Sequence, residues 1–415
     1  MSSKKLTHFI LGAMILGIVS GYLVNLYGGA SGFAVQYVEY ISVLTDIFLR
    51  LIKMIIAPLV FSTLVVGISR MGDAAAIGRV GLKTFGWFIS MSMVSLLLGL
   101  FMVNLLDPGI GVNLPIPEVT ASTGLDKGGF NVREFFQHIF PSSIFEAMGK
   151  NEILQIVVFA IFFGVAAGSF GERAEEFIRN LDMLSHIMLK ITTAVMKFAP
   201  VAVFAAVSSV IAENGLDILL TYGKFMASFY ASILMLWLVI ILISSIVLKR
   251  RAFHLVSMLR QPILLAFTTA SSEAAYPMTL EQVERFGCKN KIASFVLPVG
   301  YSFNLDGSMM YCSFAAVFIA QVYGIDMPLS QQLIMLLVLM ITSKGIAGVP
   351  RASLVVIAAT LSQFNLPEAG VLLILGIDHF LDMARSATNV LGNGLATAVI
   401  SKWEGELDPH GSSHK

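Results

Sequence analysis

The sequence contains little charge and little cysteine. Only 13% of its 415 residues are charged, whereas 56% are hydrophobic. Soluble globular proteins average about 25% charged and about 45–50% apolar residues, so this composition excludes a disordered chain and argues against a cytosolic enzyme. A formal net charge of +1 provides no basic excess for nucleic acid. Cys288 and Cys312 form neither a disulfide framework nor a metal-ligand spacing, so we expect no cofactor and no metal.

Long apolar runs are abundant instead, and the mean hydropathy is +0.82. A run of about 20 apolar residues crosses about 30 Å of hydrocarbon. The first run is longer than the apolar core of a signal peptide, so we expect it to be retained as a helix. The sequence therefore predicts an all-α integral membrane protein. The expected spans lie at about 9–27, 40–69, 78–106, 152–169, 187–212 and 218–248.

The segments between these runs predict loops and an orientation. Residues 107–131, rich in Gly, Pro and Thr, predict a long extramembrane loop, and residues 172–176 predict a water-exposed turn. Basic residues gather on one side if the spans alternate, which by the positive-inside rule is the cytoplasmic side. We therefore expect both termini in the cytoplasm. The basic residues are Lys4, Lys5, Arg70, Arg79, Lys83, Arg173, Arg179, Lys249, Arg250 and Arg251.

In the last third of the chain, polar clusters interrupt the apolar segments. Clusters at 267–277 and 342–351 each lie between apolar arms about half a bilayer long, which predicts two hairpins that enter the membrane without crossing it. Irregular backbone survives at that depth only where protein or a wet cavity surrounds it, and paired interruptions point to a transporter's binding site. The alternative is ordinary loops, with Glu273 and Arg351 in water.

A third cluster, Asn304-Leu305-Asp306-Gly307-Ser308, interrupts an apolar run from about 292 to 322. Pro298, Gly300 and Gly307 weaken the helix there, so we expect an unwound segment. Freed carbonyls beside Asp306 and Asn304 would suit a small hard cation. Alternatively, Asp306 caps a helix.

The fourth cluster is a polar stripe on a helix expected from about 367 to 402. At 100° per residue its members cover about 120° of the helix. A zwitterionic acidic ligand would need an arginine to grip a carboxylate and an aspartate to meet an ammonium, which Arg385 and Asp382 could supply. Alternatively, these two residues simply neutralise each other at i,i+3. The stripe comprises Asp378, Asp382, Arg385, Ser386, Asn389, Asn393 and Thr397.

Together these clusters resemble the glutamate transporter family, the dicarboxylate/amino-acid:cation symporters, over essentially the whole chain. The resemblance rests on the serine-rich tip Ser271-Ser272-Glu273, the segment Asn304–Ser308 that matches the family's Asn-Met-Asp-Gly-Thr motif, the tip Ala347-Gly348-Val349-Pro350, and the pattern of the final helix. Within the family it resembles bacterial proton-coupled glutamate/aspartate symporters, which implies the inner membrane of a prokaryote.

The resemblance implies eight transmembrane helices and two re-entrant hairpins with inverted repeats. It also implies a homotrimer in membrane lipid and an elevator mechanism. The expected segments are scaffold helices 1 and 2 at 1–76, transport-domain helix 3 at 77–106, an extracellular loop at 107–130, scaffold helices 4 and 5 at 131–214, the remaining transport domain at 215–406 and a cytoplasmic tail at 407–415.

The resemblance also implies the substrate contacts. Arg385 would hold the side-chain carboxylate and Asp382 the amino group, while Ser386 and Asn389 would hold the main-chain groups. The remaining contacts would be Ser271, Ser272, Ser308, Ala347, Gly348 and Val349. Related dicarboxylate carriers lack the ammonium partner and neutral amino acid carriers lack the arginine, so glutamate or aspartate is expected.

Departures from the family pattern concern the coupling ion. Asn393 stands where sodium-coupled relatives carry an aspartate, and Phe88, Met91 and Ser92 replace a tyrosine and a Thr-Ser pair. A thioether and a phenyl ring are poor ligands for a hard cation. We therefore expect proton coupling and sodium independence. The cation-site positions expected to be degraded are Asn304, Asp306, Asn389, Asn393, Met91 and Ser92.

Several assignments stay open. Glu273 is either the proton carrier, in competition with Asp306 and Asp382, or a helix-terminal charge. Arg351 either supplies positive charge near the substrate, closes a gate or faces water. Rival functions are C4-dicarboxylate or sodium-coupled transport, a membrane-embedded hydrolase and an anion channel, although no hydrolase motif is present.

Overall fold

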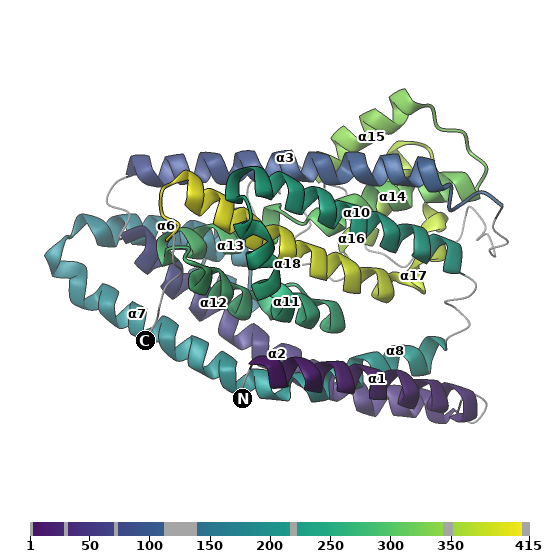
Figure 1. Cartoon of the computed structure of the whole chain (residues 1–415), viewed down its shortest axis with the longest axis horizontal. Coiled ribbons are helices and arrows are strands. Elements are labelled where there is room, and N and C mark those ends of the chain that lie inside the picture. The colour runs from purple at the N-terminus through teal and green to yellow at the C-terminus, as the bar shows by residue number, and fades with distance from the viewer. Residues whose placement is uncertain are drawn as a thin grey trace.

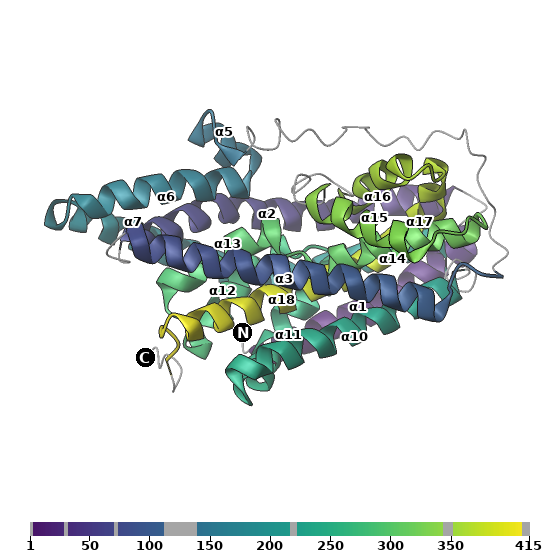
Figure 2. The same cartoon turned by 90° about the horizontal axis from the view of Figure 1, so that it is seen from above.

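The computed structural model describes residues 3–28, 32–69, 74–111, 139–215, 222–342 and 352–408. Its regular structure there is helical, apart from an isolated antiparallel bridge between Cys288 and Leu407. Most of the long helices run along the long axis of the molecule, as Figures 1 and 2 show. This arrangement is the one expected of spans that cross a membrane together.

The helices of the first half are long and few. They are α1 (Ser3–Gly28), α2 (Phe33–Ser69), α3 (Ala74–Leu106), α5 (Ile144–Lys150), α6 (Ile153–Ser169), α7 (Glu172–Val195), the 3₁₀ turn η2 (Met196–Phe198) and α8 (Ala199–Asn214).

The helices of the second half are shorter and more often interrupted. They are α10 (Gly223–Leu248), α11 (Arg251–Thr269), η3 (Glu273–Ala275), α12 (Tyr276–Phe286), α13 (Asn290–Phe303), α14 (Asp306–Val322), α15 (Leu329–Thr342), α16 (Ala352–Gln363), η5 (Glu368–Gly370), α17 (Val371–Leu375) and α18 (Asp378–Trp403).

Several segments of the described residues are long and apolar enough to cross a membrane, so the chain is a multi-pass membrane protein. They confirm the predicted first, second, third, fifth and sixth spans, whereas the run at 152–169 forms the shorter apolar helix α6. The candidate spans are His8–Gly28, Phe33–Ser69, Ala75–Leu106, Glu172–Glu213, Gly223–Leu248 and Asn290–Val322.

Two local predictions are wrong. Residues 172–176, expected as a turn, form the first turn of α7, because Gly171 adopts a positive φ of 54° and acidic Glu172 and Glu175 suit a helix N-terminus. The helix expected from 367 to 402 is broken between α17 and α18 at Gly376 and Ile377, where glycine is a poor helix former. Most of the predicted loop at 107–131 lies outside the described residues.

The helices pack in two groups. In the first, α1 packs against α8, and α2 packs against α6, α7 and α8. In the second, α18 is surrounded by α10, α11, α13 and α14, and α3 lies along α14. Figure 1 shows α1 and α8 at one side of the molecule and α3 at the other, with α18 between them. The polar stripe of α18 is therefore placed in the interior.

The crossing of α14 and α18 depends on two glycines. A Cβ atom at Gly307 would lie 2.6 Å from the carbonyl oxygen of Arg385, and one at Gly392 would come against a carboxylate oxygen of Asp306. Real Cβ atoms do not approach other heavy atoms so closely. A side chain at Gly307 would therefore require a shift of the backbone, and one at Gly392 would displace the Asp306 carboxylate. Gly307 thus allows close helix approach, in addition to the weakening of the helix expected from sequence.

A charged clamp ties the end of α18 to α3. The carboxylate of Glu404, just after α18, accepts hydrogen bonds from Arg79 Nε at 3.0 Å and Lys83 Nζ at 2.6 Å. Trp87 of α3 packs edge-on against Trp403 beside it. These contacts fix the register between the two helices.

The substitution Gly307→Ala tests the close approach of α14 and α18. We expect it to destabilise the protein by about 1–3 kcal/mol, because the added methyl group collides with the backbone of Arg385. The measurement is the thermal unfolding temperature of the detergent-purified protein. Gly86→Ala is the matched control, since a Cβ there meets nothing within 4 Å and alanine favours the helix. Equal unfolding temperatures for the two variants would contradict the packing argument.

Candidate functional site

The polar stripe of α18 is buried as predicted, with one exception. The side chains of Asp378, Arg385, Ser386, Asn389, Asn393 and Thr397 are buried. Asp382 is the exception, because its side chain is 41% exposed. The site therefore has one acidic group that solvent or a ligand can reach, beside a set of groups sealed in the interior.

Arg385 lies at the centre of the site. Its side chain is only 2% exposed, and its Nη2 atom lies 3.0 Å from Asp378 Oδ1 and 3.0 Å from Asp382 Oδ1. Its guanidinium stacks over the ring of Tyr311 at 4.2 Å from the ring centroid, a favourable cation–π contact. The Tyr311 hydroxyl donates to Asp378 Oδ1 at 3.2 Å. The i,i+3 pair with Asp382, weighed as an alternative on sequence, is thus present in the structure.

This network leaves part of the guanidinium without a partner. Within the described residues, Nε and Nη1 of Arg385 are buried and have no hydrogen-bond acceptor. Guanidinium carries five N–H donors, and leaving buried donors unsatisfied is costly. An acceptor that the described residues do not supply is therefore needed there, and a ligand carboxylate is the natural one.

The predicted break between α13 and α14 is confirmed. Asn304 and Leu305 leave the helical conformation, with φ/ψ of −120°/62° and −96°/62°. The break exposes the amide of Gly307, which donates to Asn389 Oδ1 at 2.9 Å, and Asn389 Nδ2 donates to Ser308 Oγ at 3.4 Å. The structure thus brings Ser308 and Asn389 together, one helical turn from Arg385.

The groups predicted to be cation-site positions lie beside this break. Asp306 is fully buried and accepts a hydrogen bond from Ser95 of α3 at 3.3 Å. Asn304 Nδ2 donates to Asn393 Oδ1 at 3.0 Å, which joins α13 to α18. Other α3 positions named on sequence, Met91, Ser92 and Phe88, are also buried. Phe88 lies near Asn393, because a Cβ built at Gly300 would meet Asn393 Oδ1 and come within 3.3 Å of the Phe88 ring.

The tip between α11 and α12 is tightly turned. Ala270 ends α11 in the left-handed conformation at φ 48°, and Ser271 Oγ accepts from the amide of Ala274 at 3.3 Å. The side chains of Ser271, Ser272 and Glu273 are half-buried. Ser271 therefore caps the turn that follows.

Measured along the helix axes, this tip lies at about the same level as Arg385. Leu259 of α11 lies against Gly394 of α18, and Arg251 bonds the carbonyl of Asp408, so the two helices are antiparallel. Ala270 lies 11 residues beyond Leu259, a rise of about 16 Å at 1.5 Å per residue. The same rise along α18 leads from Gly394 to Met383, which is two residues from Arg385.

The second predicted tip cannot be placed in this way. Ala347, Gly348, Val349 and Arg351, named on sequence as contacts or gate residues, lie outside the described residues. The helices on either side, α15 and α16, pack against each other and against α14. The predicted roles of these four residues stay predictions.

Sequence reasoning missed two residues of the arginine site. Asp378 was placed on the stripe without a role, although it is the buried partner of Arg385 two helical turns away. Tyr311 was not considered at all. Its position three residues after Ser308, on the same face of α14, was the available signal.

Other features of the site concern packing and metals. Trp237 of α10 donates to the hydroxyl of Thr388 at 2.8 Å, which ties α10 to α18. In the described ranges, no three His, Cys, Asp or Glu side chains group closely enough to hold a metal ion.

Comparison with known proteins connects this geometry to a class of transporters. The family model for the sodium:dicarboxylate symporter family matches residues 6–403. A proton/sodium-glutamate symport protein of Geobacillus stearothermophilus is 41% identical over 400 residues, which cover 95% of this chain and 93% of that protein. A proton/glutamate-aspartate symporter of Escherichia coli strain K12 is 40% identical over 407 residues, with 96% and 93% covered. A C4-dicarboxylate transport protein of Bacillus subtilis strain 168 is 37% identical over 412 residues, with 98% and 95% covered.

These similarities cover nearly the whole length of this chain and of each relative. The relatives are transporters rather than enzymes. The membrane-embedded hydrolase considered on sequence is therefore excluded. The chain belongs to the sodium:dicarboxylate symporter family.

Proposed function

We propose that the protein is a secondary active symporter that imports glutamate or aspartate together with protons, independently of sodium, by an elevator type of alternating access. The observation that carries this proposal is Arg385, a buried guanidinium with N–H donors that no described residue satisfies. The relatives named for glutamate, glutamate-aspartate and C4-dicarboxylate transport support a small acidic substrate.

The geometry of Arg385 determines how a carboxylate can bind. Both edges on which a guanidinium offers two parallel N–H bonds include Nη2, and Nη2 here lies against Asp378 and Asp382. A carboxylate therefore binds either through Nε or Nη1 alone, or through two bonds after one aspartate has released Nη2. Asp382 is the one to release it, because it is the more exposed of the two.

A released Asp382 carboxylate would then be free to accept the substrate ammonium group. Succinate and other C4-dicarboxylates carry no ammonium, so for them Asp382 would be a repulsive neighbour. This argument favours an acidic amino acid over a dicarboxylate. Ser386, Asn389, Ser308 and the tip residues Ser271 and Ser272 are proposed to hold the main-chain groups. Ala347, Gly348, Val349 and Arg351 are proposed to complete the site.

Charge at the site supports coupling to a cation. One guanidinium and two carboxylates, Asp378 and Asp382, have a formal charge of minus one, and glutamate or aspartate adds another negative charge. Buried uncompensated charge is strongly unfavourable in a membrane interior. Binding of a cation with the substrate removes this penalty.

Several features favour a proton over sodium. Asn393, where sodium-coupled relatives carry an aspartate, is neutral, and its Oδ1 atom already accepts from Asn304. The neighbouring Phe88 and Met91 offer no hard oxygen. A proton needs no coordination shell and can be carried by one carboxyl group.

Glu273 is the proposed proton carrier. It lies on the half-buried tip, and the charged groups close enough to act on it are Lys53 of α2 and Glu152 before α6. A carboxyl group on a half-buried tip can bind a proton in one position of the tip and release it in another. Asp306 and Asp382 are the competing candidates.

The proposed architecture has eight transmembrane helices, two re-entrant hairpins related by inverted repeats, and a homotrimeric assembly. The hairpins would be α11 with α12 and α15 with α16. The helices α1, α2, α6, α7 and α8 pack mainly with one another, and α2 and α6 meet the group around α18 at α13, which supports a scaffold and a moving transport domain. The basic clusters support cytoplasmic termini, in the inner membrane of a prokaryote.

Uptake into proteoliposomes tests the function directly. Labelled glutamate should accumulate and exchange by counterflow, with competition from aspartate and only weakly from succinate. Absence of counterflow would indicate a channel, and strong competition by succinate alone would favour the C4-dicarboxylate alternative.

The substitution Asp382→Asn tests the ammonium partner. Loss of a hydrogen bond to a charged group costs about 1.5–3 kcal/mol, so we expect competition by aspartate to weaken about 10- to 100-fold, while that by succinate does not weaken. The measurement is the half-inhibitory concentration of each compound. Asp326→Asn, an exposed aspartate between α14 and α15, is the matched control and should change neither value. An equal loss of competition by aspartate and by succinate would show that Asp382 does not bind the ammonium group.

Coupling is tested with independently imposed gradients. In sodium-free proteoliposomes, an acidic exterior should drive accumulation, and a protonophore should abolish it. Glu273→Gln should lose this accumulation and retain counterflow, because the neutral amide cannot carry a proton. Glu281→Gln, which removes a surface carboxylate paired with Arg285 on α12, is the control and should behave as wild type. A strict sodium requirement that survives collapse of the pH gradient would contradict proton coupling, and unchanged uptake by Glu273→Gln would exclude Glu273.

A further inference from the structure

A basic cavity lies near the C-terminal end of α18, away from the arginine site. It has a volume of about 590 Å³ and is formed where α10 turns into α11 and where the chain leaves α18. Lys402 lies 17 residues after Arg385 on α18, which separates the two sites by about 25 Å. The cavity is lined by Val247, Leu248, Lys249, Arg250, Arg251, Lys402 and Leu407.

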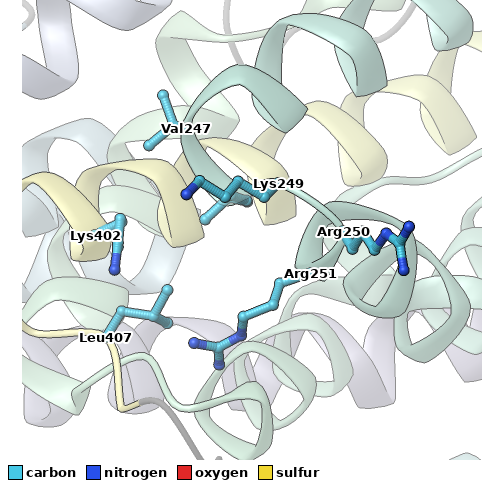
Figure 3. Close-up of a pocket in the computed structure, with 7 residues that line it drawn as sticks. Val247, Lys249, Arg250, Arg251, Lys402 and Leu407 are labelled. Atoms are coloured by element: carbon cyan, nitrogen blue, oxygen red, sulfur yellow. The ribbon is translucent and has the colours of Figure 1, made fainter.

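Three cations surround the opening of this cavity. Figure 3 shows Lys249, Arg251 and Lys402 around it, whereas the Arg250 guanidinium points away. They come from the α10–α11 turn and from the end of α18, so the fold brings together charges about 150 residues apart. No acidic side chain of the described residues lines the cavity.

The nearby carboxylates are engaged elsewhere. Glu404 is held by Arg79 and Lys83, and Glu406 pairs with Lys291. Asp408 offers its main-chain carbonyl to Arg251, and its side chain is not part of the lining. Neither Lys249 nor Lys402 pairs with an acidic side chain in the part of the chain that the structure describes. The positive charge of the cavity is therefore left for an external anion.

One of the three cations is held in place by its side-chain contacts, and a second extends from an unusual backbone conformation. Arg251 Nη2 donates to the carbonyls of Phe286 at 3.1 Å and Asp408 at 2.9 Å, and its guanidinium stacks on Phe286 at 4.7 Å. Lys249 has a φ of 55° and a ψ of −138°, a conformation that a non-glycine residue rarely adopts. The guanidinium of Arg251 is thus positioned before any anion arrives, whereas the two exposed lysine side chains can adjust to it.

We propose that this cavity binds a phosphate-bearing anion, either the headgroup of an anionic phospholipid or a soluble phosphate compound. Cations set between helices at the membrane surface are the chemistry that recognises lipid phosphates. The apolar side chains of Val247, Leu248 and Leu407 beside the cations suit the glycerol and first acyl carbons of a lipid. This site is independent of the proposed substrate and coupling ion, and it needs only that this end of the helices lies at the membrane surface.

The test compares binding of three probes to the full-length, detergent-purified protein. They are short-chain phosphatidylglycerol, phosphatidylcholine with the same acyl chains, and inorganic pyrophosphate. Each basic residue near a membrane surface is worth about fivefold in affinity, so Lys249→Gln combined with Lys402→Gln should weaken phosphatidylglycerol binding about 30-fold. Arg173→Gln combined with Arg179→Gln removes two exposed charges of α7 and is the matched control, which should bind as wild type.

The probes separate the two sources of phosphate. Binding of phosphatidylglycerol alone, lost in the cavity variant, assigns the site to a lipid headgroup. Binding of pyrophosphate with the same dependence on the variant assigns it to a soluble anion. Equal binding of every probe to wild type, the cavity variant and the control would overturn the proposal.

A footprint on the wild-type protein avoids any dependence on how the variants fold. Acetylation of exposed lysines, measured by peptide mass spectrometry, should fall severalfold at Lys249 and Lys402 when phosphatidylglycerol or pyrophosphate, whichever binds, is present. Lys289, an exposed lysine at the same end but outside the cavity, should be labelled as before. Unchanged labelling at Lys249 and Lys402 would also overturn the proposal.

Discussion

The structure around α18 depends on one constraint, a permanently charged guanidinium placed in the interior of a membrane protein. Arginine cannot lose its proton under any ordinary condition, so Arg385 must be compensated by its neighbours. Asp378 and Asp382 of the same helix and the ring of Tyr311 provide that compensation. Tyr311 belongs to α14 and comes within contact because α14 and α18 cross closely at Gly307. Compensation is nevertheless incomplete, since two nitrogen atoms of Arg385 lack acceptors among the described residues.

The same helix crossing connects the arginine site with the groups proposed for coupling. The break after α13 presents the Gly307 amide to Asn389, one turn from Arg385, while Asp306 lies in the first turn of α14 and Asn304 bonds to Asn393. A ligand that shifts α18 would therefore disturb the surroundings of Asp306 as well. The proposed substrate site and the proposed coupling groups thus contact the same helix, which gives a physical route for coupling between them.

Much of this could be predicted from the chain alone, because it follows from periodicity and from the cost of polar groups in lipid. The polar stripe of α18 and the break at Asn304 and Leu305 both have a local cause in the sequence. The role of Tyr311 and the partnership of Asp378 could not be deduced in the same way. The role of Tyr311 depends on how α14 and α18 are rotated against each other, which no local pattern reports, whereas Asp378 competes with Asp382 for Arg385 on the same face of one helix.

The errors also have local reasons. The charged residues of 172–176 suggest an exposed turn, yet acidic residues are also favourable in the first turn of a helix. The interruption at Gly376 was hidden because the apolar pattern continues on both sides of it. The basic cavity could not be predicted from the sequence, because Lys402 comes close to Lys249 only through the antiparallel packing of α11 and α18.

The most direct test of the account is a cryo-electron microscopy structure of the protein with glutamate or aspartate bound. The account predicts a ligand carboxylate in hydrogen-bond contact with Nη1 or Nε of Arg385, and the ligand ammonium at Asp382. A map in which protein groups alone satisfy that guanidinium, with the ligand bound at another place, would contradict it.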